Sequence, residues 1–257
     1  MTLGLVLKDT SKLVGKCIYC GSIENLSNEH VIPYGLGANL TLIDASCSKH
    51  RDITSRFEGE VLRKQFINLR TTQKFPSRHK NNRPEYFEFI INGEKKIVPV
   101  EDCPTMFMML WFLEPRSISD YSYDKGIGVT GTSTHGKNLE VFQKKYAVRE
   151  FAFSQDLGSD FARLIAKIAY CSAVFRYGLD SLEDVNILPS IKGEKDDIGY
   201  WVGCPINYKS GEDIPLAEIY SHKIEVIEDN GHIRVKVRLF ANYRTPEYLV
   251  IVGKLKK

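Results

Sequence analysis

The sequence predicts an α+β protein in which a small N-terminal module, organised by a metal ion, precedes a β-rich α+β domain. Three observations lead to this fold class. Cysteine and histidine pairs at metal-binding spacing fall within residues 16–58, a stretch that lacks continuous apolar periodicity. A helix with a regular apolar stripe follows them. From residue 86 onward, alternating β-type runs flank turn signals, and a second apolar helix lies among them.

The bulk composition is that of a globular protein. Of 257 residues, 43% are hydrophobic, which suffices for one large core or two modest ones. No apolar run approaches the ~20 residues needed to span a bilayer, and the N-terminus lacks the features of a signal peptide. We therefore expect a cytoplasmic protein without a membrane partner. In that compartment, clustered cysteines indicate metal binding rather than disulfides.

Four candidate zinc ligands lie in two pairs near the N-terminus. Cys17 and Cys20 form a CxxC pair, and Cys47 and His50 form a CxxH pair after 26 intervening residues. The two-residue spacing lets each pair bind one tetrahedral Zn²⁺, so structural zinc is the expected cofactor. The alternative is that this spacing is coincidental and that the cysteines bind no metal ion. The remaining cysteines are expected to be buried thiols: Cys103, Cys171 and Cys204.

A helix is predicted from about Ser48 to Leu69. Its apolar stripe consists of Ile53, Phe57, Val61, Leu62 and Phe66. The polar, basic segment 71–85 contains two prolines and is predicted to be a linker or a DNA-facing loop. Residues 49–83 together hold ten Lys or Arg and three acids, a charge of +7, so the rest of the chain carries −4. This polarity indicates either a phosphate-binding surface or a solvated helix face followed by a basic loop.

The C-terminal part is predicted to be β-rich. The expected strands are Tyr86–Ile91 and Lys95–Val100 around Asn92-Gly93, then Ile219–Ile227, Ile233–Phe240 and Tyr248–Val252. Thr105–Leu113 is expected to be buried. A helix is predicted at about Gly158–Tyr177, with Gly178 as its end. The predicted organisation is therefore a module at 1–70, a basic segment at 71–85 and an α+β domain at 86–257, whose role stays open.

Between the two zinc pairs lies the segment 27–37, Ser-Asn-Glu-His-Val-Ile-Pro-Tyr-Gly-Leu-Gly. Glu29 is followed directly by His30, two β-branched residues and a proline, which predicts a strand that presents both side chains before a loop. A lone histidine is usually structural or exposed, but the acidic neighbour and the zinc frame favour a catalytic His30. Four histidines lack such a setting: His79, His135, His222 and His232.

These motifs together resemble HNH endonucleases with a zinc-bound ββα-metal core. The resemblance covers roughly residues 17–70 and rests on Cys-x-x-Cys, Glu-His-Val-Ile-Pro, Leu-Gly, Ala45-Ser-Cys and Ile53-Thr-Ser-Arg-Phe-Glu in that order. It implies a two-stranded hairpin followed by a helix, with zinc at both pairs. It also implies that His30 is the general base for water. A catalytic Mg²⁺ or Mn²⁺ ion is then expected between strand and helix, where Glu29 binds it or orients the base.

The sequence departs from the family pattern just after the second zinc pair. Many HNH relatives have an asparagine there that contacts the catalytic ion, but this chain has Arg51, which cannot coordinate a cation. Glu58, seven residues further along the predicted helix, returns to nearly the same face and is the expected substitute ligand. Alternatively, Glu58 only pairs with nearby arginines. Arg51 is then expected to hold a phosphate oxygen with its forked donors.

The expected function is metal-dependent cleavage of phosphodiester bonds in DNA. The expected partner is duplex DNA, with RNA left open, and the expected phosphate contacts are Arg51, Arg63, Lys64 and Arg70. The alternative is a non-catalytic zinc module that binds nucleic acid or protein, in which Arg51 marks a degenerate site. Under either interpretation, the roles left open for residues 86–257 are selection of the target, binding of a partner protein and formation of a homodimer.

Overall fold

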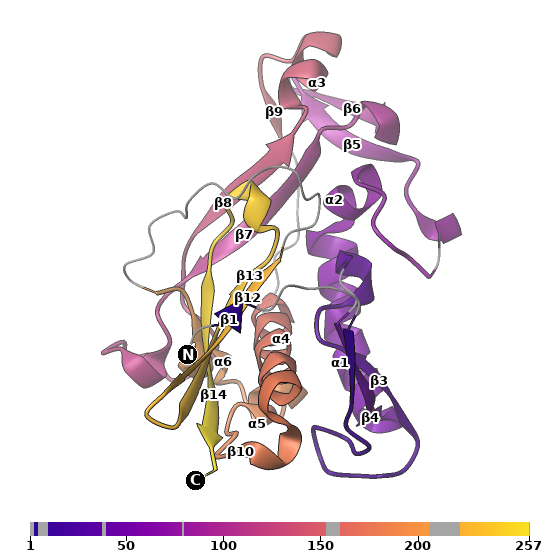
Figure 1. The fold of residues 1–257 in the computed structure, drawn as a ribbon. Coiled ribbons are helices and arrows are strands. Elements are labelled where there is room, and N and C mark those ends of the chain that lie inside the picture. The colour runs from indigo at the N-terminus through magenta and orange to yellow at the C-terminus, as the bar shows by residue number, and fades with distance from the viewer. Residues whose placement is uncertain are drawn as a thin grey trace.

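The computed structural model describes residues 3–4, 10–37, 40–78, 80–152, 160–205 and 222–256, and the structural statements below concern these residues. The fold is mixed α+β, as the sequence predicts, with several sheets and helices around one large core (Figure 1). His79, the first residues of the predicted strand 219–227 and the first residues of the predicted helix 158–177 lie outside the described residues.

The largest sheet comes mainly from the C-terminal part of the chain. β12 (Lys223–Asp229), β13 (His232–Arg238) and β14 (Tyr248–Leu255) run antiparallel, and Asn230 and Gly231 turn between the first two with positive φ. The predicted strands 219–227, 233–240 and 248–252 are confirmed over the residues that the structure describes. Three short strands complete this sheet: β1 (Leu3–Gly4) beside β12, and β10 (Leu182–Glu183) and β11 (Val202–Gly203) beside β14.

Helix α4 (Asp160–Tyr177) lies between this sheet and helix α1 (Ser48–Glu60) (Figure 1). Most of its residues are buried, as expected for a helix that packs against neighbours on two sides. It ends at Gly178, which has a φ of 89°, as predicted. Lys167 is a fully buried charged residue of this helix. Its ammonium group lies against Glu29 of strand β3 (Leu26–His30) and Glu58 of helix α1.

The N-terminal strands form a separate three-stranded sheet. β4 (Leu40–Cys47) is central, with β3 (Leu26–His30) antiparallel on one side and β2 (Thr10–Leu13) parallel on the other. The first 15 residues thus contribute two strands, because β1 and β2 both pair in sheets, and neither strand was predicted from the sequence. Strands this short carry too few alternations to be recognised from sequence.

The predicted helix 48–69 begins at Ser48, as expected, but is not one regular helix. α1 passes into a π-helical turn (Val61–Gln65) and then into α2 (Ile67–Thr72). The Phe66 N–H donates to the Val61 carbonyl at 3.1 Å, five residues back, which marks the wider turn. Arg70 donates to the Leu62 carbonyl at 3.1 Å within this turn. Such π-turns are often found at functional sites.

The segment after α2 folds back against the body of the protein. The Phe75 ring is buried and meets the Phe240 ring edge-to-face, with centroids 5.9 Å apart. Arg83 donates a hydrogen bond to the Phe75 carbonyl, and a short 3-10 turn covers Lys80–Asn82. Residues of the basic segment 71–85 therefore line the pocket described below.

Two further antiparallel strand pairs follow in the middle of the chain. β5 (Tyr86–Ile91) and β6 (Glu94–Pro99) turn at Asn92-Gly93 as predicted, and β9 (Phe151–Ala152) joins β5. β7 (Thr105–Phe112) is largely buried as predicted and pairs with β8 (Val129–Lys137), which the sequence analysis did not identify. The remaining helices are α3 (Leu139–Lys145), α5 (Leu188–Lys192) and α6 (Ile198–Trp201).

The main hydrophobic core includes residues from both predicted domains, such as Leu42 and Phe57 from the N-terminal part and Val235 and Val250 from the C-terminal sheet. The division into domains at residues 70 and 85 stays a prediction, although side chains from both sides of this boundary pack in the same core. A smaller core lies under the β5–β6 hairpin and α3. Cys103, Cys171 and Cys204 are buried free thiols, as predicted.

In the part of the chain that the structure describes, no helix has the length and apolar character needed to cross a membrane.

Candidate functional site

The four predicted zinc ligands converge on one point. Their ligand atoms all lie within 4.8 Å of one another. His50 Nδ1 is 3.2 Å from Cys47 Sγ and 3.6 Å from Cys17 Sγ, and the Sγ atoms of Cys20 and Cys47 are 3.9 Å apart. A tetrahedral zinc ion separates two sulfur ligands by roughly 3.8 Å, and a sulfur and a nitrogen ligand by roughly 3.6 Å. The cluster could therefore hold a structural metal ion such as zinc.

The elements around the cluster fix these ligands from two sides. The first pair closes through a hydrogen bond from the Gly21 N–H, and its φ of 77° suits the tight turn. Cys47 ends β4 and His50 lies in the first turn of α1. Tyr19 stacks on the His50 ring at 5.4 Å, and Tyr170 of α4 donates a hydrogen bond to the backbone of the first pair. The cluster thus ties the N-terminal sheet and α1 to α4.

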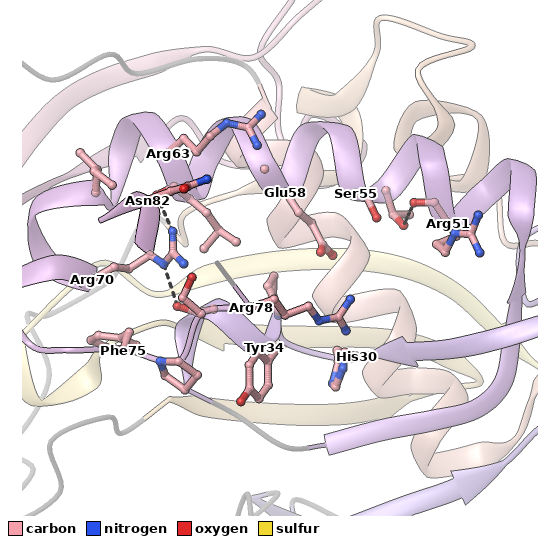
Figure 2. A pocket seen from close by; sticks show the side chains of 18 of the residues that line it. His30, Tyr34, Arg51, Ser55, Glu58, Arg63, Arg70, Phe75, Arg78 and Asn82 are labelled. Carbon is pink, nitrogen blue, oxygen red and sulfur yellow. Dashed lines mark hydrogen bonds between the residues drawn. The ribbon is translucent and has the colours of Figure 1, made fainter. Parts of the chain in front are cut away.

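A pocket of about 660 Å³ lies between the end of β3, the loop that follows it, helix α1 and the segment 75–83. Figure 2 shows side chains of α1 along one wall and His30, Tyr34 and Arg78 along the other, with Glu58 and Arg78 pointing into the space between them. The pocket brings together most of the predicted site residues: Glu29, His30, Arg51, Glu58, Arg63 and Arg70.

Helical geometry places the α1 residues as the sequence analysis predicts. Arg51, Thr54 and Glu58 recur on one face of α1, and all three line the pocket. Asp52 points elsewhere and instead accepts hydrogen bonds from its neighbour Arg51 at 3.1 and 3.2 Å. That pair is exposed, so it holds Arg51 only weakly.

His30 stands half-buried at the end of β3. Its Nδ1 is 3.3 Å from the hydroxyl of Thr41 on the neighbouring strand β4. A neutral ring that donates from Nδ1 keeps the Nε2 lone pair as an acceptor. Burial lowers the pKa of His30 below its ordinary value, and the charges of Lys167 and Arg78 lower it further, against an opposing effect of Glu29. The imidazole is therefore neutral at neutral pH and able to accept a proton.

The two predicted ion ligands meet a buried lysine. Lys167 Nζ lies 2.7 Å from Glu29 Oε1 and 2.8 Å from Glu58 Oε1, and it also donates to the carbonyl of His30. Burial on its own lowers the pKa of Lys167, but the two carboxylates outweigh burial and hold the pKa above its usual value. Burial raises the pKa of Glu58, although Lys167 opposes this. The group between β3 and α1 is thus a charged ammonium.

Five arginines line the pocket, two of which come from the segment after α2: Arg51, Arg63, Arg70, Arg78 and Arg83. Arg70 is held by the carbonyl of Gly35 at 2.9 Å as well as by the π-turn (Figure 2). Arg63 reaches Glu60 at 2.8 Å through an exposed pair. Lys64, which was also predicted to contact phosphate, pairs with the same Glu60 but is not among the pocket residues.

Comparison of the chain with protein-family models, with curated proteins and with solved structures finds no match. The resemblance to HNH endonucleases therefore rests on the motifs alone and stays a prediction, and the chemistry of the pocket has to be inferred from its own residues.

Three residues that contribute to this site were not predicted from the sequence: Lys167, Arg78 and Arg83. Lys167 stands in an apolar helical stretch more than 100 residues from Glu58, and nothing local marks it except that a lysine interrupts a run of buried residues. Arg78 and Arg83 were counted only as part of a basic loop. Because they are far from α1 along the chain, the sequence gives no sign that they line the same pocket as that helix.

Proposed function

We propose that the protein is an endonuclease that hydrolyses phosphodiester bonds, with His30 as the general base and duplex DNA as the substrate. The observation that carries this proposal is the meeting of a half-buried histidine of lowered pKa with five arginines in one pocket. A neutral imidazole can take a proton from water, and guanidinium groups bind phosphate oxygens through paired donors. This combination suits attack of water on a phosphodiester.

In the proposed reaction, His30 Nε2 takes a proton from water as the water oxygen attacks phosphorus. The bond from phosphorus to the departing sugar oxygen then breaks, and that oxygen takes its proton from solvent. Arginine N–H groups bind the non-bridging oxygens and offset the negative charge that develops there. Arg78 is the proposed first contact, because its guanidinium points into the pocket on the side of His30 (Figure 2), and Arg51 on the opposite wall is the proposed second.

The pocket does not offer the free divalent-ion site that the resemblance implies. The two carboxylates expected to bind Mg²⁺ or Mn²⁺, Glu29 and Glu58, each place one oxygen against the Lys167 ammonium. Such ions favour carboxylate oxygens that are not already neutralised by a fixed cation. No step of the proposed reaction is therefore assigned to a divalent ion.

The alternative function is a zinc-stabilised module that binds nucleic acid or protein without cleaving it. The observation that favours it is the same ion pairing, because a site whose two carboxylates pair with Lys167 and whose helix carries Arg51 has departed from the family pattern at two places. The basic pocket would then only bind phosphates.

A panel of labelled duplex DNA, single-stranded DNA and RNA tests the proposed function and its substrate. We expect both binding and cleavage of duplex DNA by the zinc-loaded protein, measured by gel shift and by denaturing gel. Cleavage of RNA or single-stranded DNA without cleavage of duplex DNA would show that duplex DNA is not the substrate. Binding of any of the three without cleavage would favour the non-catalytic module.

The lowered pKa of His30 predicts the pH dependence of cleavage. His30 must be neutral to act as a base, so the rate should fall with decreasing pH only when pH passes through a pKa below the ordinary value of 6.5. Arg78→Gln removes one charge that lowers this pKa, so the midpoint should move to higher pH. Initial rates across the acid range measure both midpoints. A wild-type midpoint above 6.5 would contradict the assignment.

Adjacent basic residues give a matched test of the pocket as the phosphate site. Arg63 and Lys64 share Glu60, but only Arg63 lines the pocket. Arg63→Glu should weaken DNA binding and lower the slope of log affinity against log salt by about 1, the effect of one lost phosphate contact. Lys64→Glu makes the same change in net charge and should alter the slope much less. Equal effects of the two variants would place the DNA elsewhere.

A further inference from the structure

We propose that the Lys167 ammonium is the permanent cation of this pocket. It occupies the place between β3 and α1 that the family resemblance gives to a divalent ion, and the site therefore neither holds nor needs Mg²⁺ or Mn²⁺. The claim about ion binding stands on the geometry of three residues. Only the claim about cleavage without added metal rests on the function proposed above.

The surroundings of Lys167 form a complete cation site. Three oxygens surround its ammonium: Glu29 Oε1 at 2.7 Å and Glu58 Oε1 at 2.8 Å form ion pairs with it, and the backbone carbonyl of His30 accepts a hydrogen bond from it. Strand β3 supplies two of these oxygens and helix α1 supplies the third. Carboxylate and carbonyl oxygens are also the ligands that hard divalent ions choose, and here an ammonium already occupies their centre.

Lys167 cannot leave this position as a surface lysine could. Its side chain is 0% exposed, and α4 is packed between the C-terminal sheet and α1. Displacing the ammonium from its oxygens would leave a charge buried without a partner, which is strongly unfavourable. A divalent ion would therefore have to bind beside Lys167.

Charge also opposes a second cation there. With Lys167 in place, Glu29 and Glu58 together with the ammonium carry a net charge of −1 rather than −2. Five arginines line the same pocket. Their positive charges repel an entering cation and attract a phosphate group. The arginines, rather than a metal ion, are then the groups that neutralise the phosphate.

Lys167 is thus a positioning residue for His30. Its hydrogen bond to the His30 carbonyl fixes the end of β3, and its pairing with Glu29 and Glu58 holds strand and helix together. Through this residue, α4 couples the C-terminal sheet to the pocket.

Binding of Mn²⁺ to the zinc-loaded protein at pH 8, followed by electron paramagnetic resonance, tests the ion-binding claim directly. Wild type and Glu58→Gln should bind Mn²⁺ equally weakly, so that no wild-type Mn²⁺ site depends on Glu58. Lys167→Met leaves two uncompensated carboxylates and should bind Mn²⁺ at least about tenfold more tightly, because repulsion between a divalent ion and a unit charge a few Å away amounts to that even in water. Adding Glu58→Gln to Lys167→Met should abolish the gain, and the exposed-site control Lys64→Met should show none.

Each outcome decides the claim. A wild-type Mn²⁺ site that depends on Glu58 would overturn it, and so would a folded Lys167→Met protein with no gain in affinity. If thermal melting shows that Lys167→Met does not fold, the comparison of wild type with Glu58→Gln decides alone.

Cleavage assays separate this inference from the proposed function. The protein is passed over a chelating resin, and retention of zinc is checked by elemental analysis. Cleavage that then proceeds without Mg²⁺ supports both proposals, whereas cleavage that requires added Mg²⁺ overturns the role of Lys167. No cleavage under either condition, together with no wild-type Mn²⁺ site, overturns the proposed nuclease function and leaves the Lys167 assignment standing.

Discussion

Replacing His30 with alanine is expected to lower the rate of phosphodiester cleavage by about 100- to 10,000-fold, the usual contribution of a general base. The imidazole is the neutral acceptor in the pocket, because burial and the charges of Lys167 and Arg78 lower its pKa. Lys167 contacts the backbone carbonyl of residue 30 rather than its side chain. The alanine variant should therefore keep the ion pairs with Glu29 and Glu58, the zinc and the fold.

Single-turnover rates with labelled duplex DNA measure this effect, and thermal melting and zinc content show that the variant is folded. His232 is an exposed histidine on β13, away from the pocket, and His232→Ala is the matched control. It should cleave at the wild-type rate. A His30→Ala protein that is folded and cleaves within a few-fold of wild type would remove His30 from the mechanism.

Loss of a zinc ligand is expected to unfold the N-terminal sheet together with α1. Cys17→Ser or Cys47→Ser removes one of four ligands whose atoms lie within 4.8 Å of one another. Structural zinc commonly contributes roughly 10 kcal/mol or more of apparent binding free energy, which becomes folding free energy where the site forms only in the folded state. Tyr19 and Tyr170 link the cluster to α4, so the disruption should reach the main core.

Elemental analysis and hydrogen exchange measure these changes. Wild type should contain about one zinc per chain, and both serine variants should lose it and exchange rapidly in β3, β4 and α1. Cys103 is a buried thiol of the smaller core, and Cys103→Ala should retain zinc and protection in those elements. A zinc-free wild-type protein that is fully protected there would disprove the structural metal.

The parts of the fold that could be predicted from sequence are those with strong local signals. Asn92-Gly93 and Asn230-Gly231 mark hairpins because both residues of each pair adopt positive φ. The apolar repeat of α4 and its end at Gly178 are equally local. The short strands β1 and β2 and the π-turn at Val61–Gln65 were missed, because long-range pairing and tertiary packing determine them rather than a pattern in neighbouring residues.

The candidate site likewise contains residues that could be predicted from the sequence and residues that could not. The candidate zinc ligands could be found because metal geometry fixes their spacing, and Glu58 could be placed because helical periodicity brings it to the face of Arg51. Lys167 could not be found, because its contacts with Glu29 and Glu58 exist only once α4 packs against α1. That contact also changes the expected chemistry, since it places an ammonium where a metal ion was predicted.

The central claim is that this pocket cleaves phosphodiester bonds with His30 as the base. Incubation of zinc-loaded wild type and His30→Ala, side by side at equal concentration, with supercoiled plasmid at neutral pH tests it most directly. We predict that wild type converts the plasmid to open-circular and then linear DNA, and that His30→Ala leaves it supercoiled over the same time. Conversion that is equal in both proteins, or absent from both, would contradict the proposed function.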